Sequence, residues 1–111
     1  MTVKLALLKS GEDIIADIKE IVANEKVVGY VFEKPCIANM IQEIENEEKS
    51  YRIKLSTWIP LSKTEHIPVT AEWVITIVDP VDSLENLYKS EVLKNDQTNS
   101  IDEQSDSDIE D

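Results

Sequence analysis

Hydrophobic and polar residues alternate along most of the first 78 residues, a pattern typical of β-strands. The first apolar run, VKLALL at residues 3–8, leads into the turn KSGE, where Gly11 is free to adopt positive φ. The next run, DIIADIKEIV at residues 13–22, predicts a half-buried strand. Its apolar face carries Ile14, Ala16, Ile18 and Val22. Ile15 and Ile21 interrupt the opposite, polar face, so we expect part of that face to be covered as well.

Three more runs have β character. VVGYVFEKPCIANMIQEI, residues 27–44, contains Gly29 and Pro35, which indicate strong bending, a bulge or a sheet edge. The pattern leaves open whether this run is one bent strand or two. YRIKLSTWIP, residues 51–60, and VTAEWVITIV, residues 69–78, both alternate. The residues predicted to face inward are Tyr51, Ile53, Leu55 and Ile59 in the first and Val69, Ala71, Trp73, Ile75 and Ile77 in the second.

The hydrophobic period changes after residue 78 and predicts a short helix over residues 80–93. Asp79 and Pro80 fit the N-cap and the first helical position. The apolar positions at helical spacing are Val81, Leu84, Leu87, Tyr88 and Val92. The fold class is therefore mainly β, with five to six strands joined by short turns in a small barrel or sandwich, followed by one C-terminal helix.

Charge divides the chain into two parts. The 111 residues carry a formal net charge of -12, and residues 95–111 hold seven acidic residues with no lysine or arginine. With only Ile101 and Ile109 as large apolar residues, this tail is predicted to be disordered. Residues 1–94 form the expected domain. The tail suits either solubility or the binding of a basic protein.

Residues suited to catalysis are scarce. One cysteine, one histidine and two glycines exclude a disulfide, a cysteine-ligated metal centre and a glycine-rich phosphate loop. We interpret Cys36 as a small buried residue and His66 as an exposed loop histidine. The alternative is that these two residues form a catalytic pair. We expect no enzyme activity, no cofactor and no metal site. No run approaches the length of a membrane span, and no signal peptide is recognisable, so a cytoplasmic protein with no membrane partner is expected.

The opening hairpin resembles the first motif of Sm-like proteins, a family of small β-barrels. That motif is a strand, a polar turn ending in glycine, and a strand with a small residue followed by an apolar one, matched here by Gly11, Ala16 and Ile18. The order L-x-x-G-E-x-I-I-A, and VITIVDP followed by Tyr88, are similar to divergent Sm-like proteins in tailed-phage genomes. The resemblance implies a strongly bent five-stranded barrel and closed homo-oligomeric rings. For a phage protein it also implies the cytoplasm of the host cell.

The residues that contact RNA in the family are poorly matched. The region of its Asp-x-x-Met-Asn element reads IVANEKVVGY, and residues 60–78 lack the late glycine of its second motif. The candidate RNA-binding residues that remain are Asn24, Lys26, Lys34, Arg52, Lys54 and Trp58. Trp58 follows the outward phase of its strand, so it either packs on the helix or a neighbouring subunit or offers a stacking platform for a base. Trp73 is expected in the core.

Ring formation in the family pairs the fourth strand of one subunit with the fifth strand of the next. This implies subunit contacts along residues 51–60 and 69–78. The candidate interface residues are Ile53, Leu55, Trp58, Trp73, Ile75 and Ile77. We therefore expect a non-enzymatic, RNA-associated homo-oligomeric ring. The alternative is a protein-binding scaffold or adaptor without nucleic-acid binding, which the acidic composition favours.

Overall fold

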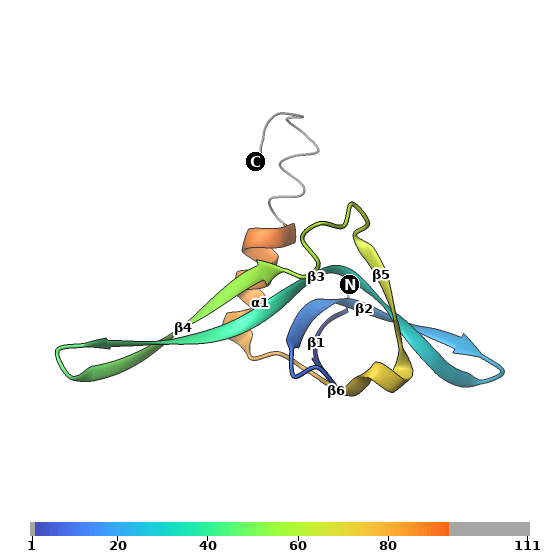
Figure 1. Cartoon of the computed structure of the whole chain (residues 1–111), viewed down its shortest axis with the longest axis horizontal. Helices are drawn as coiled ribbons and strands as arrows, with labels where there is room; N and C mark the ends of the chain where they lie inside the picture. The colour runs from blue at the N-terminus through green and yellow to red at the C-terminus, as the bar shows by residue number, and fades with distance from the viewer. Residues whose placement is uncertain (1, 94–111) are drawn as a thin grey trace. The chain divides into compact units, whose positions relative to one another are not determined.

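The computed structural model describes residues 2–93, which form a six-stranded antiparallel sheet followed by a short helical segment (Figure 1). The strands are β1 (Val3–Leu8), β2 (Asp13–Ala23), β3 (Lys26–Glu45), β4 (Glu48–Thr57), β5 (His66–Thr70) and β6 (Val74–Val78). The sheet order is β4-β3-β2-β1-β6, and β5 pairs with β3. The expected mainly β fold is confirmed.

β3 is one strand of 20 residues with a bulge in its middle, which settles the open question about residues 27–44. Lys34 has a φ of 53°, and the pairing with β2 shifts register between Ile15 and Asp17. The second neighbour of β3 also changes here. β5 pairs with β3 from Gly29 to Glu33, and β4 pairs with it from residue 36 to residue 45.

Backbone hydrogen bonds at the bulge hold both ends of the connection between β4 and β5. The N–H of Lys34 donates to the carbonyl of Glu65 at 2.8 Å, and the N–H of Trp58 donates to the carbonyl of Pro35 at 3.1 Å. A bulge is a place where proline is tolerated within a sheet, because the ladder is already interrupted there. The bulge at Lys34–Pro35 therefore joins the two halves of the sheet.

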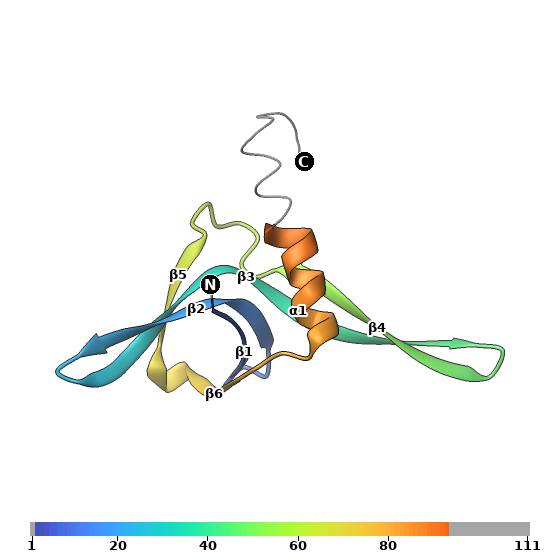
Figure 2. The ribbon, with the colours of Figure 1, turned by 180° about the vertical axis from the view of Figure 1, so that it is seen from behind.

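Two tight turns connect the long strands. Asn24 and Glu25 have φ values of 52° and 65°, and Asn46 and Glu47 have φ values of 53° and 67°. These are two-residue turns with positive φ at both central positions, whose twist suits a β-hairpin. The hairpins β2–β3 and β3–β4 extend toward opposite ends of the sheet in both views (Figures 1 and 2).

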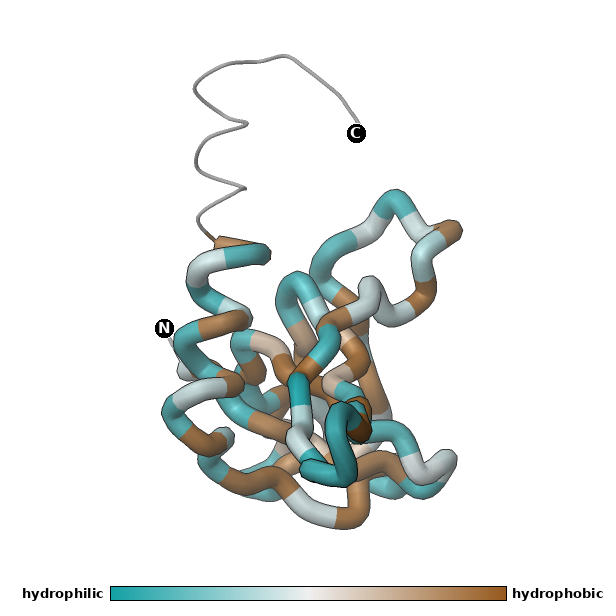
Figure 3. The backbone as a smooth tube through the Cα atoms, turned by 90° about the vertical axis from the view of Figure 1, so that its left-hand side faces the viewer, coloured by the Kyte–Doolittle hydropathy of each residue, from teal (hydrophilic) through white to brown (hydrophobic). Residues whose placement is uncertain are grey.

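The core lies where β1, β2, β3 and β5 meet. It consists of Ala6, Leu8, Ile14, Ala16, Ile18, Phe32 and Val69. The alternation predicts the inward direction of the four members on β2 and β5, namely Ile14, Ala16, Ile18 and Val69. Brown and teal segments alternate along the sheet in Figure 3, as the period-two pattern requires. Ile15, on the other face of β2, is also fully buried, so the expected cover on part of that face is confirmed.

Five residues predicted to face inward are exposed instead. Val22 is 57% exposed, Tyr51 61%, Ile59 44%, Trp73 45% and Ile75 59%. Val22 and Tyr51 lie in the outer parts of the two hairpins, where only two strands are paired. Ile59 lies in the β4–β5 loop with a φ of 56°. The alternation of apolar and polar residues continues into parts of the strands that no other element covers. A prediction from alternation alone therefore assigns too many residues to the core.

The expected barrel does not close. Residues 69–78 form no continuous strand, because the 3-10 turn η1 (Ala71–Trp73) separates β5 from β6. Within residues 2–93, β5 pairs with β3 and β6 pairs with β1, and no pairing joins β5 to β6. The sheet is therefore open between these two consecutive strands, and the prediction of a closed small barrel is wrong for the single copy.

The helical segment comprises α1 (Asp82–Tyr88), which continues as η2 (Lys89–Leu93). Leu84 and Tyr88 are buried, as their spacing predicts. The N-cap is Val81 rather than Asp79, whose carboxylate instead pairs with the ammonium of Lys4. Residues up to Pro80 and residues from Val81 form two compact units. The predicted acidic tail, residues 95–111, lies outside the described residues, and no helix among residues 2–93 is long and apolar enough to cross a membrane.

At Gly29 the backbone of β5 approaches β3 too closely for a side chain. A Cβ atom there would lie 2.9 Å from the carbonyl oxygen of Val69. Gly29→Ala should lower the free energy of unfolding by about 1 to 3 kcal/mol, because the clash is with backbone. Urea denaturation measures the change. Val28→Ala, at an exposed neighbouring position, is the control, and an equal loss in both variants would contradict the close approach.

The β3–β4 turn carries a glutamate at positive φ, a conformation that costs an L-residue with a side chain about 1 to 2 kcal/mol. Glu47→Gly should therefore raise the free energy of unfolding by about 0.5 to 1 kcal/mol after the added freedom of the unfolded chain is subtracted. Glu45→Gly removes the same charge from the adjacent strand and should destabilise the protein. Thermal unfolding of the two variants against the parent chain distinguishes these outcomes.

Candidate assembly interface

The opening between β5 and β6 leaves two strand edges without a partner in the described part of the chain. β5 has β3 on one side, β6 has β1 on one side, and the other side of each strand carries no ladder. Every second residue of such an end strand turns its backbone N–H and C=O away from its single neighbour. Unpaired edges of this kind are templates for pairing with another chain.

The edge formed by β6 is short, with five residues, and its pairing with β1 shifts register beside Ile75, two features that limit association. Its sequence, VITIV, nevertheless contains no charged residue, no proline and no glycine. Ile75 is 59% exposed and Val78 is 47% exposed, and Trp73 just before the strand is 45% exposed. Ile77 and Val74 are partly buried and pack against the core. Two residues of β6 therefore pack against the core, and two apolar β-branched residues, Ile75 and Val78, are exposed.

A shallow groove of about 620 Å³ lies alongside β6. It is lined by side chains from β1, β2, β3 and β6, and both polar and apolar groups contribute to it. The lining residues are Thr2, Lys4, Ile18, Lys19, Glu20, Tyr30 and Val74 to Ile77. The surface next to the β6 edge is therefore concave rather than flat.

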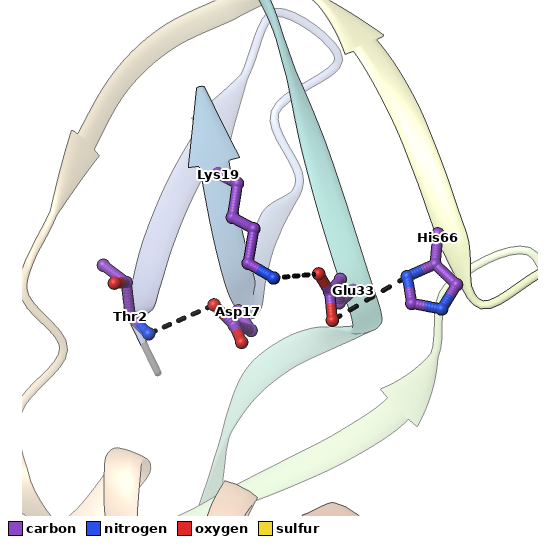
Figure 4. A network of polar contacts seen from close by, with 5 residues as sticks. All are labelled: Thr2, Asp17, Lys19, Glu33 and His66. Atoms are coloured by element: carbon purple, nitrogen blue, oxygen red, sulfur yellow. Dashed lines mark hydrogen bonds and ion pairs between the residues drawn. The ribbon is translucent and has the colours of Figure 1, made fainter. Parts of the chain in front are cut away.

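A row of polar residues crosses β2, β3 and β5 (Figure 4). The Nζ of Lys19 lies 2.7 Å from a carboxylate oxygen of Glu33, and the other oxygen lies 3.7 Å from Nδ1 of His66. The backbone N–H of Thr2 donates to Asp17 at 3.1 Å. The hydrogen bond from Lys19 lowers the pKa of Glu33, and the hydrogen bond to Glu33 raises the pKa of Lys19. These contacts fix β3 between its two neighbours.

The candidate RNA-binding residues are not gathered on one surface. Asn24 and Lys26 lie at the β2–β3 turn, and Arg52 and Lys54 lie on β4, in the hairpin that extends the opposite way (Figure 1). Lys34 lies at the bulge between them. Any nucleic-acid surface that uses them all would have to combine several copies.

Two of these candidates have partners within the same copy. The Nε of Arg52 lies 3.5 Å from the carboxylate of Glu43. Trp58 is partly buried against the core, with its ring centroid 6.0 Å from that of Phe32 and the ring planes inclined by 42°. Trp58 therefore packs as a structural residue, rather than standing free for stacking on a base.

The candidate interface residues fall into two groups. Ile53 and Leu55 lie half-buried on β4, whereas Trp73, Ile75 and Ile77 lie in η1 and β6. The expectation of a buried Trp73 is wrong, because η1 turns this residue out of the strand pattern. The sequence does not reveal the opening between β5 and β6, since alternation runs through residues 69–78 without a break.

Cys36 and His66 point to different partners. The Sγ of buried Cys36 lies 3.9 Å from the carbonyl of Lys34, and His66 is exposed and faces Glu33. His66 lies in β5 rather than in the expected loop. Among residues 2–93, no cluster of three His, Cys, Asp or Glu side chains is arranged to hold a metal ion.

The Lys19–Glu33 contact makes stability depend on pH in a defined direction. Because the pKa of Glu33 is lowered below 4.5 in the folded state, its contribution is present above pH 4.5 and is lost as the pH falls through the lowered value. Glu33→Gln should remove this acid-side loss, with a small effect because the groups are exposed. Melting temperatures between pH 3 and 7 test this, with Glu20→Gln as the control, and identical profiles in all three proteins would contradict it.

Comparison of the sequence with family models and with curated proteins finds no match.

Proposed function

We propose that this protein is a non-enzymatic, Sm-like homo-oligomer in which β5 of one copy pairs with β6 of the next. The observation that supports the proposal is the open sheet, which leaves one unpaired edge on each of two consecutive strands. In a closed barrel, the two strands beside the opening would be hydrogen-bonded to each other within one chain. Pairing between copies would supply these backbone hydrogen bonds from a neighbouring chain instead. It would also cover Ile75 and Val78, the exposed apolar residues of β6.

A contact between two different edges is heterologous, so it propagates from copy to copy and ends only when the rotation closes a ring. β5 and β6 are joined by the three-residue turn η1. This short turn sets the angle between the two edges, and that angle would set the rotation from one copy to the next. Pro68 lies in β5 and has no N–H, so a ladder along this edge would lack one donor and would depend on the remaining residues of β5. A ring also accounts for Trp73, since its exposed indole lies beside the edge that would be paired.

RNA association stays a prediction attached to the ring. Binding to phosphates requires a concentration of positive charge, and the chain has a net charge of -12. Lys26 and Lys34 would be repeated once per copy around a ring, whereas a single copy holds them at separate places. A scaffold that binds only protein remains the alternative, and the charge favours it.

The ring predicts a single native mass that is a closed multiple of 12.6 kDa, measured by light scattering during gel filtration. Ile75→Lys should abolish it and leave a species of one or two copies, because a charge on a strand edge blocks pairing. Val28→Lys makes the same change on an exposed residue of β3 and should leave the ring intact. A parent chain that is monomeric at high concentration would contradict the proposal.

The same samples separate the ring from its predicted ligand. Full-length protein mixed with labelled RNA at increasing salt should bind with an affinity that falls steeply with salt, if the repeated lysines contact phosphate. Lys26→Glu should then weaken binding without changing the native mass. A ring that binds no RNA at low salt would identify the scaffold alternative.

A further inference from the structure

The β3–β4 hairpin is an arm that extends past the rest of the sheet. Pairing of β3 with β2 ends at Ile37, and pairing with β5 ends at Glu33, so residues 38–55 form a ribbon of two strands. At roughly 3.3 Å per residue, each strand of this arm is about 26 Å long. A ribbon of two strands is marginally stable in water without further cover.

One face of the arm is apolar and exposed. Alternate residues of β3 and their partners on β4 share this face, and the opposite face carries Glu43, Arg52 and Lys54. Met40 is 70% exposed, Ile44 67% and Tyr51 61%. The outer edge of β4 has no strand partner in the part of the chain that the structure describes. Within residues 2–80, the arm thus has no strand beside its outer edge and exposes the apolar residues Met40, Ile44 and Tyr51.

The charges on β4 include three without an ion pair and one unfavourable pair. Within residues 2–93, Glu48, Lys49 and Lys54 form no ion pair, whereas Arg52 is paired with Glu43. Glu48 lies directly opposite Glu45 across the ribbon. Like charges in directly opposite positions destabilise a strand pair. A positive charge placed beside Glu48 would relieve this repulsion.

We infer that two copies of the chain pair antiparallel through the outer edges of β4, about a two-fold axis at Tyr51. The result is a continuous ribbon of four strands, β3 and β4 from one copy followed by β4 and β3 from its partner. Tyr51 lies opposite its own counterpart, and Lys54 of each copy lies opposite Glu48 of the other. Two cross-strand ion pairs form, and the repulsion between Glu45 and Glu48 is relieved twice.

The charge pattern selects this register over its neighbours. The two-fold axis must pass through a residue, because the apolar faces of the two copies then lie on the same side of the ribbon. An axis between two residues would place apolar residues opposite polar ones. The alternative registers therefore have their axes at the neighbouring residues. An axis at Arg52 places two guanidinium groups opposite each other, and an axis at Ile53 places Arg52 opposite Lys54 in both directions. An axis at Ser50 places Glu48 opposite Arg52, which Glu43 already neutralises, and shortens the paired segment to residues 48–52. The register at Tyr51 pairs residues 48–54, and among these axes it alone places Lys54 opposite Glu48, two opposite charges with no ion pair in the single copy.

This contact uses a different edge from the proposed ring, so the two can be tested separately. The ring uses β5 and β6, whereas the arms meet through β4. Ile75→Lys blocks the ring edge and should leave the β4 contact intact, giving a dimer. Ile75→Lys combined with Lys54→Glu should give a monomer.

A charge swap tests the pairing of Lys54 with Glu48. In the Ile75→Lys background, Lys54→Glu should raise the dissociation constant of the dimer about tenfold or more, because two attractive contacts become repulsive. Adding Glu48→Lys should restore the dimer, since the two charges are exchanged. Lys63→Glu, in the β4–β5 loop, makes the same change of net charge away from the arm and is the matched control. Sedimentation across a concentration series measures each constant.

A crosslink tests the register. Paired residues in an antiparallel ladder have Cα atoms about 4.5 to 5.5 Å apart, within the range that a disulfide spans. Tyr51→Cys in full-length protein should therefore form a covalent dimer on mild oxidation. Lys49→Cys should not, because its counterpart would lie about 13 Å along the strand. The parent chain, with buried Cys36, is the control for crosslinking through the native thiol.

Three results would overturn the inference. Failure of the Glu48→Lys and Lys54→Glu swap to restore the dimer would exclude the ion pairs. Crosslinking at Lys49→Cys rather than Tyr51→Cys would exclude the register. A monomer in the Ile75→Lys background, at concentrations where the protein carrying the parent β6 edge assembles, would exclude the β4 contact and leave the ring proposal standing.

Discussion

The bulge at Lys34–Pro35 is the constraint on which the rest of the sheet depends. A continuous 20-residue strand has two edges, and without an interruption each would carry one long neighbour. The left-handed backbone at Lys34 and the missing donor of Pro35 end the pairing with β5 and allow pairing with β4 to begin three residues later. One strand therefore belongs both to the packed core, through Phe32, and to the projecting arm. The position of the bulge decides where the core stops.

The alternation of apolar and polar residues predicts the strands that form the core. It also predicts buried residues in the outer parts of the hairpins, where the structure has none. The opening hairpin, the buried residues of β2 and the helical spacing of Leu84 and Tyr88 follow from local patterns, because local periodicity determines which face a residue occupies. Whether that face is covered is a non-local property. Tyr51 and Val22 alternate as regularly as Ile14 does, yet they lie where only two strands are paired. Positive φ at Asn24 and Asn46 was within reach of sequence reasoning, since asparagine tolerates this conformation.

The candidate interface was only half predictable for the same reason. Residues 69–78 have the composition of a single strand, and the turn at Ala71–Trp73 that opens the sheet has no glycine or proline to reveal it. The sequence places subunit edges at residues 51–60 and 69–78, and in the structure β4 and β6 are the two end strands of the sheet. The unpaired edge of β5, next to the opening, is not expected from the pattern. Trp73 is exposed beside η1, whereas the sequence predicts it in the core.

The two kinds of edge in this molecule differ in the physics that would govern their pairing. β6 is uncharged, so association through it depends on apolar burial and backbone hydrogen bonds and should change little with salt. β4 carries Glu48, Lys49, Arg52 and Lys54, and charges on an edge prevent indiscriminate pairing. The same charges admit a partner whose pattern complements them, and for an antiparallel pair that partner can be the strand itself. Specificity at β4 is therefore electrostatic and should weaken as salt screens exposed charges. The chain thus combines one uncharged unpaired edge, β6, with one charged unpaired edge, β4, and the two proposed contacts should respond differently to salt.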